Sequence, residues 1–136
     1  MRRILLDTGF WVALLDRSET RHRSSVEIFE DLNALLVTTE PVLTEVVYLL
    51  GPEVRAQKAC IEFVTRGGVT LVPQSTGSLE RSASLMARYS DVPMDFADST
   101  LVVLAEELDI CEVLTLDVKG FSAYRIRGRK AFRILA

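Results

Sequence analysis

Residues 3–8 have the sequence RILLDT, and this stretch decides the fold class. Its unbroken apolar run, Ile4 to Leu6, is typical of a β-strand that is covered on both faces. Asp7 follows at once, and residues 10–15 then have the composition of a short helix. An apolar strand that leads directly into a helix predicts a sheet with helices packed against it.

The rest of the chain continues this alternation of strands and helices. Apolar spacing and Pro or Gly boundaries predict helices at residues 24–32, 41–50, 55–66, 78–89 and 95–108, and apolar runs predict strands at 35–37, 69–72, 112–116 and 132–135. The pattern predicts a three-layer α/β/α sandwich around a mainly parallel central sheet. No linker or repeat interrupts it, so residues 1–136 are expected to form a single domain.

The composition is that of a compact globular domain, with 136 residues of which 49% are hydrophobic and 26% charged. Cys60 and Cys111 lie far apart in apolar surroundings, so we expect no disulfide and a cytoplasmic location. Asp7 interrupts the N-terminal apolar run, and we expect no signal peptide and no membrane span. The single histidine, His22, excludes most zinc, serine-hydrolase and cysteine-hydrolase sites unless it carries one itself.

The net charge of −3 conceals an uneven distribution. Residues 119–136 contain six basic and no acidic residues, which leaves ten basic and nineteen acidic residues before them. This C-terminal segment is therefore a candidate contact for a polyanion such as RNA, and the candidate residues are Lys119, Arg125, Arg127 and Arg129. The alternative is a solvated basic tail that keeps the protein soluble.

Two predicted strands end in aspartate, at Asp7 and at Asp117. Because the carboxyl ends of parallel strands lie at one edge of a sheet, both carboxylates are expected there. A hydroxyl lies near each of them, on Thr8 and Thr115, and could hold a carboxylate or a water in place. The alternative for each aspartate is a turn or a helix cap.

Two predicted helices supply further carboxylates. Glu45 shares a helix face with Val42, Val46 and other apolar residues, and a carboxylate there is costly unless a cation or a donor meets it. Asp95 and Asp98 open another helix, where Asp98 shares the face that packs on the sheet. The alternatives are a solvent-facing Glu45 and an aspartate pair that only caps its helix.

If all these carboxylates meet at one sheet edge, their mutual repulsion calls for a divalent cation with oxygen ligands. Mg²⁺ or Mn²⁺ fits an all-oxygen set in a chain without a usable His/Cys pair. Such a site activates water and stabilises the charge that builds up on a phosphodiester during in-line attack. The residues therefore indicate metal-dependent cleavage of a nucleic-acid backbone.

Four short motifs in this order resemble those of PIN-domain ribonucleases, particularly the VapC-like toxins of toxin–antitoxin pairs. They are LLDT at residues 5–8, LTEV at 43–46, MDFAD at 94–98, and LTLD at 114–117 with Phe121 shortly after. The resemblance covers essentially the whole chain. The sequence departs from the family pattern at Gly9, where many members have a bulkier residue. This difference affects the expected shape of the pocket mouth and not the expected chemistry.

The resemblance implies the roles of individual residues. The acidic ligands of the family match Asp7, Glu45, Asp98 and Asp117, with Asp95 as the additional acid of some members and Thr115 as the hydroxyl that orients the pocket. It also implies a Mg²⁺- or Mn²⁺-dependent endoribonuclease, often a homodimer, which an antitoxin inhibits by inserting into the active-site groove.

Other readings of the acidic residues explain less of the sequence. A phospho-acceptor receiver domain needs an aspartate at the end of a central strand, and residues 69–73 offer none. A haloacid-dehalogenase-type phosphatase needs a second aspartate two residues after Asp7, where Gly9 stands. A non-catalytic module that keeps the fold and binds RNA or a protein remains open as the alternative function.

Overall fold

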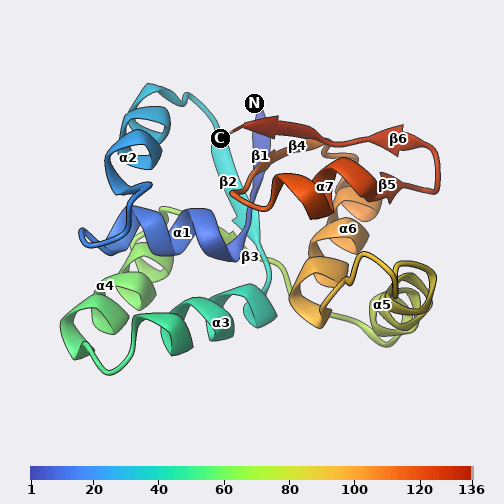
Figure 1. Ribbon diagram of the computed structural model, residues 1–136, viewed down its shortest axis with the longest axis horizontal. Coiled ribbons are helices and arrows are strands. Elements are labelled where there is room, and N and C mark those ends of the chain that lie inside the picture. Colours follow the sequence, from blue (N-terminus) through green and yellow to red (C-terminus); the bar gives the residue numbers. More distant parts are fainter. Residues whose placement is uncertain (136) are drawn as a thin grey trace.

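The computed structural model describes residues 1–135 (Figure 1). Its strands are β1 (Arg3–Leu6), β2 (Leu35–Thr38), β3 (Thr70–Leu71), β4 (Glu112–Leu114), β5 (Arg125–Ile126), β6 (Lys130–Ala131) and β7 (Arg133–Leu135). Its helices are α1 (Thr8–Leu15), α2 (His22–Asp31), α3 (Glu40–Leu50), α4 (Val54–Thr65), α5 (Thr76–Arg88), α6 (Phe96–Leu108) and α7 (Val118–Ala123).

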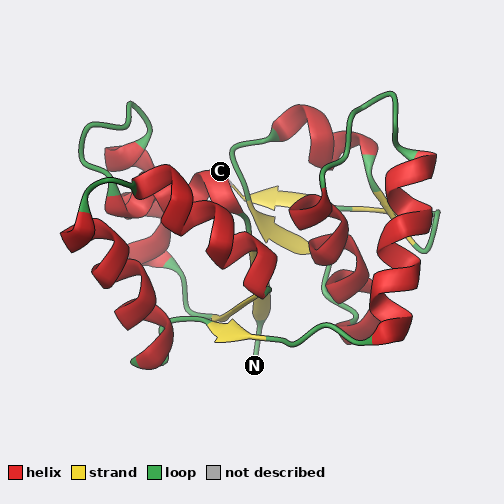
Figure 2. Cartoon of the chain, turned by 90° about the horizontal axis from the view of Figure 1, so that it is seen from below, coloured by secondary structure: helices red, strands yellow, loops and turns green. Residues whose placement is uncertain are grey.

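A five-stranded sheet in the order β3-β2-β1-β4-β7 forms the middle layer, and all its neighbouring strands are parallel. Helices α1 to α4 lie on one side of it and α5 to α7 on the other (Figures 1 and 2). The predicted three-layer α/β/α sandwich is thus confirmed. From β1 the chain passes to β2 on one flank, and it returns later to β4 on the other. The carboxyl ends of β1 and β4 therefore flank the point where the strand order reverses, which is where such folds bind ligands.

Strand β1 lies at the centre of the core, as its apolar run predicts. Ile4, Leu5 and Leu6 have no exposed surface, and Phe10 and Trp11 of α1 are equally buried. Helix α6 buries eight of the nine residues from Ala97 to Ala105, all except Asp98. Because α6 packs so tightly, the position of its N-terminal turn is fixed relative to the sheet.

The basic C-terminal segment is an integral part of the fold, whereas the charge pattern alone also allowed a solvated tail. Residues 118–123 form α7, β5 and β6 form a hairpin, and β7 pairs with β4 as an edge strand. The sequence did not predict α7 or the hairpin. Both are shorter than the apolar periods that reveal an element, and the hairpin turn depends on positive φ angles at Arg127 and Gly128.

Some predicted boundaries were also wrong. Helix α1 begins at Thr8 rather than at Phe10, and β4 ends at Leu114 rather than at Leu116. The strand stops early because the hydroxyl of Thr115 accepts a hydrogen bond of 2.9 Å from the backbone amide of Asp117, which bends the chain. Both cysteines are free, as expected. No helix within residues 1–135 is long and apolar enough to cross a membrane.

Candidate active site

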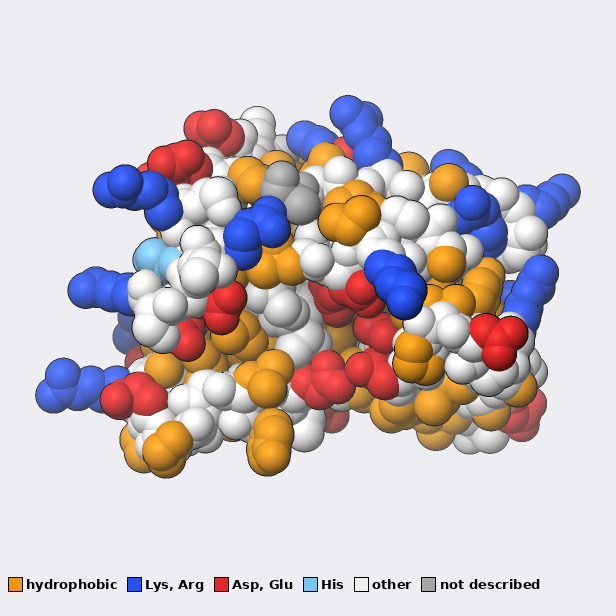
Figure 3. Space-filling view, in the orientation of Figure 1, with side chains coloured by type: hydrophobic (Ala, Val, Ile, Leu, Met, Phe, Trp, Pro, Cys, Tyr) orange, Lys and Arg blue, Asp and Glu red, His pale blue; other side chains and the backbone are white. Residues whose placement is uncertain are grey.

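The predicted acidic residues lie around the carboxyl ends of β1 and β4. Asp7 directly follows β1, and its backbone amide donates to the carbonyl of Leu114 at the end of β4 over 3.0 Å. Figure 3 shows acidic side chains gathered in the hollow between α3 and α6 on this face of the molecule. The tertiary structure thus brings together carboxylates that are up to 110 positions apart in the chain.

Asp7 is the most deeply buried of these carboxylates, with 4% of its surface exposed. The hydroxyl of Thr115 donates to its Oδ2 over 2.6 Å. Burial raises the pKa of Asp7 to about 6, against the Thr115 hydrogen bond, which lowers it. Thr115 therefore holds the carboxylate in place but does not neutralise it.

Glu45 projects from α3 toward the same region. The hydroxyl of Thr8 donates to its Oε1 over 2.8 Å, so the residue after Asp7 orients the carboxylate of the neighbouring helix. The side chain is half-buried, and burial raises its pKa, with a further contribution from the charge of Asp95. Glu45 is thus neither fully solvent-facing nor buried, and Thr8 is the hydrogen-bond donor that meets its carboxylate.

Asp95 and Asp98 form a reciprocal capping box at the start of α6. The amide of Asp98 donates to Oδ1 of Asp95 over 2.8 Å, and the amide of Asp95 donates to Oδ2 of Asp98 over 3.2 Å. Burial first, and then the charges of Asp7 and Asp95, raise the pKa of Asp98 to about 8. Asp98 therefore caps its helix, as the capping alternative states, and its carboxylate also lies close enough to Asp7 to feel its charge.

Asp117 lies at the mouth of the site, where it is exposed and caps α7. Its Oδ1 accepts from the amide of Gly120 over 3.0 Å. A side chain at Gly120 would have its Cβ 2.3 Å from Oδ2 of Asp117 and 3.0 Å from the hydroxyl of Tyr124. Gly120 thus allows the close approach of Asp117 and Tyr124.

Tyr124 is a site residue that the sequence did not reveal. Its hydroxyl donates to Oδ2 of Asp98 over 3.1 Å, and its side chain is fully buried. It belongs to none of the four motifs, and only the fold of residues 118–126 carries it to Asp98. The sole signal in the sequence is a polar aromatic residue shortly after Asp117.

The donor set fits a hard divalent cation. None of the five carboxylates forms an ion pair with Lys, Arg or His among the described residues, and the ion pairs that do occur lie elsewhere. Burial is the main cause of the raised pKa values of Asp7 and Asp98, and neighbouring carboxylates raise them further. Within residues 1–135, however, no three acidic, His or Cys side chains stand close enough to form a ready-made metal cage. The carboxylates are instead oriented one by one, by hydrogen bonds from hydroxyl groups to Asp7 and Glu45 and from a backbone amide to Asp117.

The predicted RNA-contacting residues occupy different surroundings. Lys119 is exposed on α7, two residues after Asp117, and Arg129 is exposed in the β5–β6 turn. The guanidinium of Arg125 donates to the carbonyls of Ser122 and Tyr124. Arg127 donates to the carbonyl of Glu106 at the C-terminal end of α6, eight residues or about 12 Å along the helix from Asp98.

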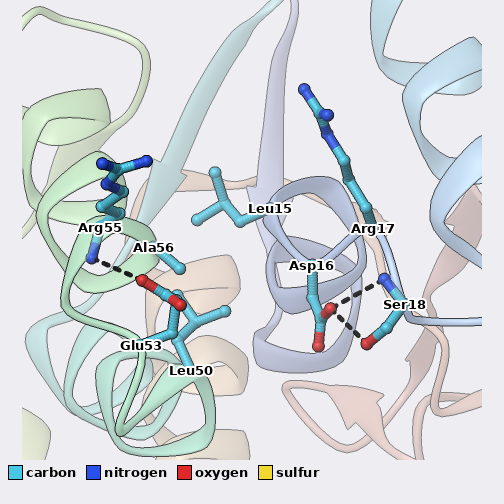
Figure 4. A pocket seen from close by; sticks show the side chains of 8 residues that line it. All are labelled: Leu15, Asp16, Arg17, Ser18, Leu50, Glu53, Arg55 and Ala56. Carbon is cyan, nitrogen blue, oxygen red and sulfur yellow. Dashed lines mark hydrogen bonds between the residues drawn. The ribbon is translucent and has the colours of Figure 1, made fainter.

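His22 and a cavity near α4 lie outside the acidic site, and their polar groups form hydrogen bonds within their own surroundings. The Nδ1 of His22 lies 2.7 Å from the carbonyl of Ala13 and so helps to join α2 to α1. A cavity of about 640 Å³ lies between the end of α1 and the start of α4, and its lining includes Asp16 and Glu53 (Figure 4). Both carboxylates accept hydrogen bonds from residues two positions later in the chain.

Comparison with known proteins places this geometry in a family. The PIN domain family matches residues 4–126. The chain is 28% identical to Ribonuclease VapC26 of Mycobacterium tuberculosis over 134 residues, which are 97% of this chain and 99% of the relative.

Solved structures share the fold. The crystal structure of M. tuberculosis VapC20, described as a sarcin-ricin loop cleaving toxin, has a TM-score of 0.81 at 20% identity and covers 89% of this chain and 95% of its own. A toxin–antitoxin complex from Klebsiella pneumoniae has a TM-score of 0.70 at 19% identity, covering 98% and 96%. Since the family match spans most of the sequence and the predicted fold is present, the chain belongs to the PIN domain family.

Proposed function

We propose that this protein is a Mg²⁺- or Mn²⁺-dependent endoribonuclease and the toxin of a toxin–antitoxin pair. The observation that carries the proposal is the group of five carboxylates at the β1 and β4 ends, which no cation of the described chain neutralises. The name of the 28% identical relative, a ribonuclease, and the toxin–antitoxin structures with the same fold support it.

The residues that would hold the metal are Asp7, Glu45, Asp98 and Asp117, with Asp95 as an auxiliary acid. A divalent metal held by these residues would supply a Lewis acid for the activation of water and positive charge to offset the charge that develops on the phosphate. Thr115 and Thr8 hold the carboxylates of Asp7 and Glu45 through hydrogen bonds of 2.6 and 2.8 Å. This orientation fixes oxygen donors before substrate arrives, so little rearrangement is needed at the moment of reaction.

The basic C-terminal segment supports RNA as the substrate, and the solved structures with this fold support a protein partner. RNA would contact Lys119 beside the site and Arg129 on the hairpin, with Arg125 and Arg127 contributing positive charge from the same C-terminal segment. An antitoxin protein is the expected partner, since three of the solved structures with this fold are toxin–antitoxin complexes. We also propose a homodimer, a single domain and a cytoplasmic location.

The test is cleavage of single-stranded RNA by the purified protein with and without divalent metal. We expect cleavage in Mg²⁺ or Mn²⁺ and none in EDTA, and we expect Asp7→Asn and Asp98→Asn to abolish it while the circular dichroism spectrum stays unchanged. Asp91→Asn, at an exposed position outside the site, is the matched control and should cleave normally. Undiminished cleavage by either site variant would contradict the proposal.

A further inference from the structure

A groove of about 470 Å³ runs between α3 and α6, next to the acidic site. It is lined by Glu40, Pro41, Thr44, Glu45, Phe96 and Ala97. Glu45 belongs to both the groove and the acidic site, so the two are continuous. The first turns of α3 and α6 face each other here (Figure 1). A polynucleotide with one phosphate at the carboxylates would therefore place a neighbouring nucleotide in this groove.

Phe96 is the feature of the groove that core packing does not explain. It is the first residue of α6 and stands between the two aspartates of the capping box. The residue is 41% exposed, in a helix whose next residues are nearly all buried. Within residues 1–135 it forms no ring pair, while Phe121 and Tyr124 pair with each other nearby. An apolar ring is thus presented to the groove at the edge of the site.

The charges that line the groove select what it can hold. Glu40 and Glu45 disfavour a phosphate group, because like charges repel. The carboxylate of Glu40, which is not among the residues that would hold the metal, can accept hydrogen bonds from the amino and imino groups of a nucleobase. The hydroxyl of Thr44 already donates to the carbonyl of Glu40 over 3.0 Å and is not needed for this purpose.

We propose that the groove between α3 and α6 binds one unpaired nucleobase of the RNA substrate, stacked on the ring of Phe96. The base lies beside the phosphate that is cleaved, and its face must be open, so the substrate is single-stranded at this nucleotide. Stacking on an aromatic ring tolerates any base, and hydrogen bonds to the Glu40 carboxylate favour bases with amino groups. This inference rests on the proposed nuclease function and adds a nucleobase subsite, with Phe96 as its stacking residue, beside the acidic site.

The experiment compares Phe96→Ala and Phe96→Trp with the wild-type protein on a short labelled single-stranded RNA in Mn²⁺. We expect Phe96→Ala to raise KM roughly tenfold with little change in kcat, and Phe96→Trp to retain the wild-type KM. Leu79→Ala is the matched control, because Leu79 is 46% exposed on α5, outside the groove, and its loss should leave KM unchanged. Circular dichroism and sedimentation measure the fold and the oligomeric state of each variant.

A second substrate separates stacking from other effects. In a series of the same RNA, each member carries one abasic nucleotide at a different position. When the missing base is the one that stacks on Phe96, the wild-type protein and Phe96→Ala should cleave that RNA with equal KM. Equal KM values of the two proteins on the intact RNA would overturn the proposal. So would a change in oligomeric state with Phe96→Ala, since the groove would then be an interface between copies. Absence of cleavage by the wild-type protein would instead refute the nuclease function itself.

Discussion

The hydroxyl of Tyr124 donates a hydrogen bond of 3.1 Å to Oδ2 of Asp98 and so joins the segment after α7 to the first turn of α6. The same carboxylate oxygen accepts from the amide of Asp95, which leaves Oδ1 of Asp98 free of any hydrogen bond in the described chain. Burial and the nearby carboxylates raise the pKa of Tyr124, so the phenol stays protonated and remains a donor. Tyr124 is thus a positioning residue, which directs one oxygen of Asp98 toward the hollow.

The first prediction concerns Tyr124→Phe. The variant should bind Mn²⁺ several-fold more weakly in calorimetric titration and should cleave RNA more slowly at saturating substrate, because Asp98 loses the donor that orients it. The ring still packs edge-on against Phe121 and Tyr89, so the fold should persist. Tyr89→Phe is the control. It removes a hydroxyl from the same aromatic cluster, one that accepts from the amide of Arg125 and does not contact Asp98. Equal metal affinity of the two variants would show that the Tyr124 hydroxyl is merely structural.

The second prediction concerns Gly120 and Gly9. Gly120→Ala should weaken metal binding and destabilise α7, because its Cβ would lie 2.3 Å from Oδ2 of Asp117. Gly9→Ala should be neutral or stabilising by up to about 1 kcal/mol, since alanine favours a helix and its Cβ would only touch Leu116 at 3.8 Å. Thermal unfolding and metal titration of both variants measure these effects. A Cβ at position 9 would contact Leu116 and none of the carboxylates. The glycine found here in place of the family's bulkier residue therefore does not alter their positions.

The third prediction is that the metal-free protein loses stability as pH rises. The ordinary pKa of an aspartate is 3.8, whereas in the folded chain it is about 6 for Asp7 and about 8 for Asp98. Between these values the folded state binds more protons than the unfolded state, so this stability is full below about pH 4 and is lost as pH rises through the folded pKa values. The loss is at most about 1.4 kcal/mol per pH unit for each group.

Thermal unfolding in EDTA between about pH 5 and about pH 8 measures this dependence. We expect the unfolding midpoint to fall over this range, and Asp7→Asn and Asp98→Asn each to flatten the curve, because asparagine does not titrate. Mn²⁺ should raise the midpoint most at the high end of the range, where the carboxylates are charged. A midpoint that rises steadily with pH in EDTA would contradict the assignment of uncompensated charge to these residues.

The fourth prediction separates two neighbouring arginines of the hairpin. Arg129→Ala should weaken RNA binding and reduce the dependence of log affinity on log salt by about one unit, as expected for one lost phosphate contact. Arg127→Ala should instead lower the free energy of unfolding by about 1 kcal/mol, because its guanidinium caps the end of α6 at Glu106 and lies 3.7 Å from Asp109. Binding measured over a range of salt concentrations, together with chemical denaturation, distinguishes the two roles. If Arg129→Ala leaves the salt dependence unchanged, the hairpin does not contact RNA.

The sequence by itself determined the α/β class, the parallel sheet and the family, because these depend on periodicity and on short motifs. An apolar run such as residues 4–6, in a chain where strands alternate with helices, is typical of a sheet that helices cover on both faces. The aspartates that follow two such strands must then meet at one edge, so the neighbourhood of Asp7 and Asp117 was predictable. Helical spacing placed Glu45 and Asp98 on apolar helix faces, but it left open whether Glu45 faces solvent and whether Asp98 only caps its helix.

Only the tertiary structure decided how these carboxylates are held and what surrounds them. The contacts from Thr115 to Asp7, from Thr8 to Glu45 and from Tyr124 to Asp98 join residues 108, 37 and 26 positions apart. The same holds for the basic C-terminal segment. Its composition showed positive charge, but only the structure shows that Arg127 caps α6 whereas Arg129 stays exposed. Local pattern encodes which face of an element is apolar, whereas the partner of a buried polar group depends on how distant elements pack.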